Sequence, residues 1–297
     1  MRALLLINPY SRQGKKAQGS VKQHLEAVGV DVLEKTPQTP AQFSQLIHRY
    51  HPQVDCAIIG GGDGTLNAAL PGLIATQLPL GVLPLGTAND LARTLHIPTS
   101  LPLACQAIAA GRIQRIDLGW VNGQYFFNVA SCGLSVKITQ KLSHQAKQRW
   151  GVFAYALTAW QVLRKSRPFT AEIVTPTQIL TVKTIQIAVG NGRYYGGGLS
   201  VAPDAAIDDA RLDTYSLEVK HWWQVLWFLP ALWLGPRNTA LGMRTLDGEE
   251  ITIRTRRSQP ITIDGELATH TPATFRVIPK LLPVFVPDTS ESQAIAL

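Results

Sequence analysis

The sequence is poor in cysteine. Only Cys56, Cys105 and Cys132 occur in 297 residues. Three cysteines without paired spacing supply neither a disulfide framework nor a zinc site. We therefore expect reduced thiols, buried as small apolar side chains, in a protein of the cytoplasm.

Long apolar runs are also missing. Residues 3–7 form too short a run for a signal peptide, and we expect none at the start. The tryptophan-rich residues 222–234 fall short of the ~20 residues that span a bilayer, and Pro230 interrupts them. Because Lys220 and Arg237 flank this run, we expect it to make partial, peripheral contact with a membrane surface. The alternative is a core helix packed on the second domain.

Acidic residues are outnumbered by basic ones, 20 against 28, which gives a net charge of +8. Such a balance suits an anionic partner, either a nucleotide, a nucleic acid or an anionic membrane surface, although solubility alone would also account for it. The basic residues are scattered and no nucleic-acid recognition motif occurs, so we expect no nucleic-acid partner. The sequence gives no indication of oligomeric state.

The order of apolar runs predicts two kinds of architecture. Runs at residues 4–7, 56–59 and 80–85 each lead through a small or polar turn into a helical segment, which indicates a parallel sheet with crossover helices. From about residue 169 the runs become short and alternating, as in antiparallel sheet, with helical segments near residues 150–165 and 222–234. We predict an α/β fold with a three-layer, parallel-sheet domain over residues 1–132. A β-rich, sandwich-like domain follows over residues 133–288, and its C-terminal segment is a candidate to return to the first domain.

Four glycines crowd around one aspartate in IIGGGDGTLN, residues 58–67. A glycine-rich turn between a strand and a helix lets the backbone approach a ligand, and the helix start offers unpaired N–H groups to phosphate. Asp63 would repel a bare phosphate, so we expect Mg²⁺ or its water between them. The stretch is no P-loop, and Thr65 replaces the third glycine of a dinucleotide motif.

A second turn, LPLGTANDLA, follows the next apolar run. It places Gly86 and Thr87 at a strand end, and either Thr87 or Asn89 could cap the helix that follows. The fold predicts that this turn lies beside the glycine-rich one. The first turn adds Asn8 and Lys15, and Lys15 either meets a phosphate or stays solvated.

A series of motifs in chain order carries a resemblance: NPYS…GK, GGGDGTLN, LPLGTANDLA, IDLG, FNVASCG, VGNGRYYGGGLSVAPDA, DDARLD and IDGE. The set resembles the diacylglycerol-kinase-like lipid kinases, most closely the bacterial YegS-type members, over about residues 8–266. The resemblance implies ATP- and Mg²⁺-dependent transfer of phosphate to a lipid hydroxyl. It also implies that the first domain binds the nucleotide and the second the lipid.

The resemblance assigns the ATP site residue by residue. It implies contacts at Thr36, Gly62, Asp63, Gly64, Thr65, Leu66, Asn67 and Thr87. The chain departs from the family pattern at three positions. Ala68 stands where glutamate is common, Arg12 where glycine often follows the serine, and Ala210 replaces the glycine of DDG. The first two departures leave the affinity for ATP undetermined. The third lies in the acid-rich stretch APDAAIDDARLD, described next.

Two acidic motifs supply candidates in the second domain. TIDGEL carries Asp264 and Glu266, which strand alternation would place on one face, although Asp-Gly is also a common hairpin turn. The resemblance implies that Glu266 accepts the hydroxyl proton, with Asp264 as the rival. APDAAIDDARLD is dense enough in acid to hold Mg²⁺ or Ca²⁺, or is a solvated turn. The resemblance implies a structural or regulatory metal here, held by the Asp209 side chain and the carbonyls of Ala206 and Arg211.

Other functions stay open on the sequence alone. NAD kinases and sugar kinases share GGDGT, and a catalytically silent module that binds lipid or nucleotide is a further alternative. The acidic motifs and the tryptophan-rich run favour the lipid kinase. The sequence does not identify the lipid, since diacylglycerol, phosphatidylglycerol and sphingoid bases all present a hydroxyl near a membrane surface.

Overall fold

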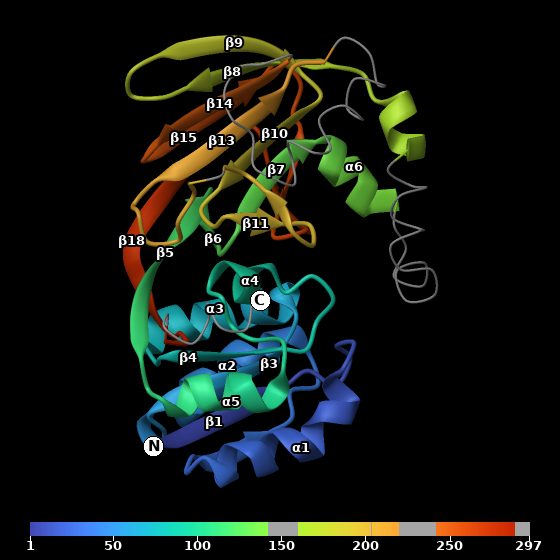
Figure 1. The fold of residues 1–297 in the computed structure, drawn as a ribbon. Helices are drawn as coiled ribbons and strands as arrows, with labels where there is room; N and C mark the ends of the chain where they lie inside the picture. The colour runs from blue at the N-terminus through green and yellow to red at the C-terminus, as the bar shows by residue number, and fades with distance from the viewer. Residues whose placement is uncertain (142–159, 203, 220–241, 289–297) are drawn as a thin grey trace.

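The structure is a computed structural model that describes residues 1–141, 160–202, 204–219 and 242–288. Its two halves are stacked, with most helices gathered around a few strands in the lower half of the view and most strands in the upper half (Figure 1). This arrangement confirms the predicted fold class, which is a parallel sheet with helices followed by a β-rich part.

The first half is built on parallel strands in the order β2-β1-β3-β4. These strands are β1 (Arg2–Ile7), β2 (Asp31–Lys35), β3 (Cys56–Gly61) and β4 (Leu80–Pro84). β1 is buried from Ala3 onward and β3 throughout, because helices cover both faces of the sheet. The expected runs at residues 4–7, 56–59 and 80–85 fall on these strands.

The helices of this half pack in pairs, α1 with α5 and α2 with α3. The helical elements are α1 (Gly14–Ala27), α2 (Pro40–Tyr50), the short 3-10 turn η1 (His51–Gln53), α3 (Asp63–Thr76), α4 (Asp90–Thr94) and α5 (Leu101–Ala109). In α1 the buried residues Gly14, Ala17, Val21 and Leu25 recur at three- and four-residue spacing, which gives one apolar stripe toward the sheet.

The second half contains an antiparallel sheet in the order β14-β13-β10-β7-β16-β17. Its strands are β7 (Val129–Gly133), β10 (Gln186–Gly190), β13 (Leu212–Leu217), β14 (Met243–Gly248), β16 (Pro260–Ile263) and β17 (Glu266–His270). Helix α6 (Leu134–Lys141) follows β7, and the small hairpin β11 (Tyr194–Tyr195) and β12 (Leu199–Ser200) follows β10. Strand β7 crosses the boundary expected between residues 132 and 133.

One long strand connects the two halves. β18 (Ala273–Phe285) pairs in parallel with β4 through Val284 and Leu80, and runs antiparallel to β5 (Ile113–Val121). The sheet continues through β15 (Glu250–Thr255), β8 (Phe169–Val174) and β9 (Ile179–Thr184), while β6 (Gln124–Phe126) pairs with β5. A second apolar core fills the space between this extension and the antiparallel sheet. The end of the chain therefore helps to hold the two halves in one arrangement.

The expected tryptophan-rich segment, residues 222–234, lies outside the described residues. Of the helical segment expected near residues 150–165, residues 160–165 are described and are helical. In the part of the chain that the structure describes, no helix has the length and apolar character needed to cross a bilayer.

Candidate active site

The glycine-rich turn joins β3 to α3, as the sequence predicts. β3 ends at Gly61, Gly62 is extended, and α3 starts at Asp63. The backbone N–H groups of Thr65 and Leu66 donate to the carbonyl of Gly62 at 2.9 and 3.2 Å. The N–H groups of the first helical residues have no partner inside the helix, so this end of α3 is suited to an anion.

Sheet register brings the other turns to the same edge. Ile7 of β1 lies opposite Gly60, and Gly61 opposite Pro84, so the parallel strands end together. The Asn8 side chain donates to Thr65 Oγ1 at 2.8 Å. Gly86 packs so closely that a Cβ there would lie 2.4 Å from the Cα of Gly62. The expectation that these turns are neighbours is confirmed by these contacts, and only glycine fits at the contact.

The capping of α4 differs from the expectation. Asn89 is the N-cap residue, but its side chain accepts from Gly86 N at 2.9 Å and makes no cap hydrogen bond. Instead, Asp63 Oδ1 accepts the N–H of Leu91 at 3.1 Å. The side chain that caps α4 thus comes from the neighbouring glycine-rich turn. The sequence around α4 alone could not indicate this partner. It ties Asp63 to a fixed position between two helix starts.

Asp90 links this edge to the second half. It is 5% exposed, and both its carboxylate oxygens accept from Gly197 N, at 3.1 and 3.0 Å, in the β11–β12 hairpin. Burial, and then the charge of Asp63, raises the pKa of Asp90 to about 6. Asp90 is not among the site residues that the sequence predicted. Its position in GTAND, directly after a turn at a strand end, was the available signal.

Asp264 and Glu266 have different environments. Asp264 lies in the turn between β16 and β17, and it accepts N–H groups of Phe127, Asn128 and Val129 at 2.9–3.0 Å. Burial is the main cause that raises its pKa to about 6. Glu266 is exposed at the start of β17. The expectation that both share a strand face is wrong, because Asp264 and Gly265 form the turn itself.

The hairpin of β16 and β17 that carries Asp264 and Glu266, called the acidic hairpin below, lies against the glycine-rich turn. A Cβ placed on Gly64 would lie 2.8 Å from Glu266 Oε1. Asp63 is close enough to Asp90 and Asp264 to raise the pKa of each. Residues that are some 200 positions apart in the sequence are therefore brought to one place, where the helix start of the first half faces the carboxylates of the second.

The remaining residues of the expected ATP site are spread along the same edge. Both amide atoms of the Asn67 side chain are buried without a hydrogen-bond partner among the described residues, while Leu66 is buried in the core. Thr87 is exposed in its turn. Thr36 follows β2, also exposed, and its Oγ1 accepts from Gln18 Nε2 at 3.2 Å.

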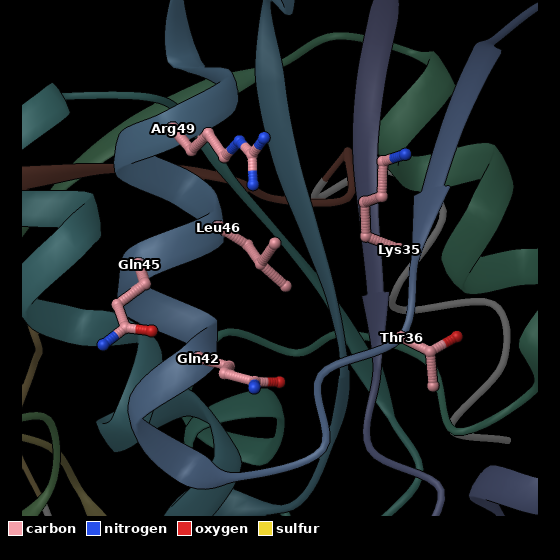
Figure 2. A pocket seen from close by; sticks show the side chains of 6 residues that line it. All are labelled: Lys35, Thr36, Gln42, Gln45, Leu46 and Arg49. Atoms are coloured by element: carbon pink, nitrogen blue, oxygen red, sulfur yellow. The ribbon is translucent and has the colours of Figure 1, made fainter.

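Thr36 also borders a surface pocket of about 290 Å³ at the end of β2 (Figure 2). Figure 2 shows Lys35 and Thr36 on one side and the α2 side chains on the other. The full lining is Lys35, Thr36, Gln42, Gln45, Leu46 and Arg49. The pocket lies beside β2, the edge strand of the parallel sheet.

The expected metal loop is already occupied by internal contacts. Asp209 Oδ2 accepts from Ala206 N at 3.3 Å, and Oδ1 from Arg211 N at 3.1 Å. Ala210 has a φ of 56°, in the left-handed region that favours glycine. This backbone conformation explains why the family pattern has glycine at the position that alanine occupies in this chain. Over the described residues, no three His, Cys, Asp or Glu side chains group closely enough to hold a metal.

Two family models match the chain. The diacylglycerol kinase catalytic domain matches residues 2–121, and the YegS C-terminal NAD kinase beta sandwich-like domain matches residues 128–286. The chain belongs to the YegS-type, diacylglycerol-kinase-like lipid kinase family. The motifs that carried the resemblance therefore identified the family correctly, and a lipid kinase is the enzyme class of that family.

Individual members of this lipid kinase family align over most of their length. A Yersinia enterocolitica protein named "Probable lipid kinase YegS-like" is 32% identical over 80% of this chain and 81% of its own. A Staphylococcus saprophyticus protein named "Diacylglycerol kinase" is 24% identical over 99% of this chain and 98% of its own. The crystal structure of a diacylglycerol kinase from Bacillus anthracis has a TM-score of 0.77 at 21% identity, and covers 97% of both chains. At that identity the structural match supports the fold alone.

Proposed function

We propose that the chain is an ATP-dependent lipid kinase. It transfers the γ-phosphate of ATP to a hydroxyl of a membrane lipid of the phosphatidylglycerol or diacylglycerol class. The observation that carries this proposal is the approach of Glu266 to Gly64, where a Cβ would lie 2.8 Å from the carboxylate. An exposed carboxylate beside an anion-binding helix start is the combination that phosphate transfer to an alcohol requires.

The chain's own groups suit a nucleotide. The start of α3 offers N–H groups to the phosphates, and the tight contact of Gly62 with Gly86 keeps side chains out of the turn. The unpartnered, buried amide of Asn67 is a polar group that a ligand would satisfy. Mg²⁺ bound with the triphosphate would neutralise its charge, and Asp63 is the carboxylate that would face it, directly or through water.

Glu266 is the proposed base, and Asp264 the residue that positions the hairpin. As the lipid oxygen bonds to the γ-phosphorus and the bond from that phosphorus to ADP breaks, the hydroxyl proton passes to Glu266. Asp264 is engaged with three backbone N–H groups, which leaves it poorly placed to accept a proton from a substrate. Its contacts fix the turn that carries Glu266.

The function is tested by transfer from γ-labelled ATP to diacylglycerol, phosphatidylglycerol and a sphingoid base in mixed micelles, with NAD and a sugar as controls. We expect label in a lipid, and a loss of label with Glu266→Gln but not with the exposed Glu172→Gln. Labelled NAD with unlabelled lipids would favour an NAD kinase. Nucleotide binding without transfer to any acceptor would favour a silent module.

Peripheral contact with an anionic membrane surface, from the cytoplasm, is part of the proposal and is supported by the net charge of +8. Sedimentation with vesicles measures it directly. We expect the protein to pellet with vesicles that contain phosphatidylglycerol, and less with vesicles of phosphatidylcholine alone. Equal recovery in both supernatants would contradict it.

A further inference from the structure

The acidic loop, residues 204–213, contains its own cation. The guanidinium Nη2 of Arg211 lies 3.3 Å from Asp204 Oδ2, 3.5 Å from Asp209 Oδ2 and 3.3 Å from Asp213 Oδ1. Asp208 is turned elsewhere and accepts from Gln114 Nε2 at 2.9 Å. One guanidinium thus stands among the carboxylates that would otherwise attract a divalent ion.

The side chain expected to bind the metal is already engaged. Each oxygen of Asp209 accepts a backbone N–H, from Ala206 and Arg211, and Oδ2 also faces the guanidinium. A second cation placed against Asp209 would lie next to Arg211 and be repelled by it. The Asp209 side chain, which the family resemblance assigns to a metal, is therefore poorly suited to one in this chain.

The loop is anchored to the site by Asp117, which is 1% exposed on β5. Asp117 Oδ2 accepts from Ala210 N at 2.6 Å, and its own N–H donates to Ile207 at 2.8 Å. Asn191 then connects the carbonyls of Asp117 and Phe127, at 3.0 and 2.8 Å. Because Phe127 N donates to Asp264, a change in the shape of the loop would be transmitted to the acidic hairpin.

We propose that the Arg211 guanidinium takes the place of a structural divalent cation, so that the loop, and through Asp117 the acidic hairpin, is held without a metal. A guanidinium cannot be lost to chelation or deprotonated at any ordinary pH. The fold of the loop is therefore independent of divalent ions. Any need for Mg²⁺ in catalysis belongs to the nucleotide, not to this loop, so the inference stands apart from the kinase activity.

The test uses full-length, nucleotide-free protein. Thermal unfolding is measured in EDTA, Mg²⁺ and Ca²⁺, and Tb³⁺ luminescence reports a carboxylate-rich ion site. We expect the wild type to show one melting temperature in all three and no Tb³⁺ signal that depends on Asp209. We expect Arg211→Leu to melt lower in EDTA and to recover by about 3 °C or more in Ca²⁺ or Mg²⁺. Adding Asp209→Asn should abolish that recovery.

Matched variants separate charge from packing. Arg211→Lys keeps the charge and should stay insensitive to divalent ions, while Arg254→Leu, at an exposed arginine on β15, controls for the loss of any one arginine. A wild-type Tb³⁺ signal that Asp209→Asn removes would overturn the proposal. So would an Arg211→Leu protein that is destabilised equally with and without divalent ions. If Arg211→Leu does not fold under any condition, the wild-type and Arg211→Lys measurements decide.

Discussion

The two acidic regions of the second half differ in what balances their charge. In the hairpin, Asp264 is held by backbone N–H groups and lies near Asp63 and Asp90. In the loop, residues 204–213, the carboxylates surround the guanidinium of Arg211. Among the residues that the structure describes, Asp264 forms no ion pair, and negative charge of this kind suits an external cation with a triphosphate. In the loop, negative charge that is partly balanced by a guanidinium suits a structural role.

If the hairpin charge serves catalysis, the largest effect should come from Glu266. We expect Glu266→Gln to lower turnover by about 100-fold, within the range for loss of a general base, with an unchanged free energy of unfolding. Asp264→Asn should lower turnover by about tenfold or more and also cost roughly 1–3 kcal/mol of stability, because the amide nitrogen cannot accept a buried N–H. Initial rates and urea unfolding measure the two quantities.

The control for both variants is Glu172→Gln, at a carboxylate on β8 that pairs with Arg254 on the surface. It should leave rate and stability unchanged. Full activity in both hairpin variants would contradict a catalytic role for the hairpin. Neither acidic region would then take part in the reaction, and the proposed functional difference between hairpin and loop would be lost.

The gathering of the carboxylates of Asp63, Asp90 and Asp264 should also appear as a pH dependence of stability. The pKa of Asp90 is raised from 3.8 to about 6, so between these values the folded protein binds a proton that the unfolded chain does not. Stability from this group is full below pH 3.8 and is lost as the pH rises through 6. The stability of wild type relative to Asp90→Asn should fall on the order of 3 kcal/mol across this window.

Urea unfolding of both proteins from acidic to neutral pH measures this difference. Asp90→Asn keeps an oxygen that can accept from Gly197 N, which limits the structural loss. Gly19→Ala, which changes no titratable group and whose Cβ would meet nothing within 4 Å, is the control and should show a constant difference from wild type. A constant difference for Asp90→Asn as well would mean that Asp90 carries no unfavourable charge when folded.

The smallest expected effect concerns the contact between the two halves. Gly64 does not have a positive φ, so alanine fits its backbone, but the new Cβ would displace the flexible end of Glu266. We expect Gly64→Ala to lower turnover by about tenfold, roughly 1.4 kcal/mol in activation free energy, while the fold is retained. The measurement is kcat with far-UV circular dichroism.

Gly19→Ala is the matched control, because a Cβ there meets nothing within 4 Å on α1. It should leave turnover unchanged and stabilise the protein by about 0.5–1 kcal/mol through helix propensity. If Gly64→Ala were as active as Gly19→Ala, Glu266 would not need the close approach to the glycine-rich turn.

Much of the fold and part of the site followed from local patterns. Buried strands followed by small turns predicted the parallel sheet, and the helix that begins at Asp63 lies where GGGDGT indicated. Alternation failed at Asp264 and Glu266, because a turn has no strand faces. The prediction that Asn89 could cap α4 was wrong, because the helix N–H of Leu91 is accepted by Asp63 from another turn. At Asn89 the deciding contact came from a residue distant in sequence.

The family, the glycine-rich turn and the two acidic motifs could be recognised from the residues alone, because they depend on residue types at short spacing. Which acid is buried, which one faces Gly64, and which cluster has its own cation became clear from the folded chain. Those outcomes depend on desolvation and charge among side chains brought together by β18, by the sheet register and by the hydrogen bonds of Asp117. Local spacing contains no information on distances of that kind.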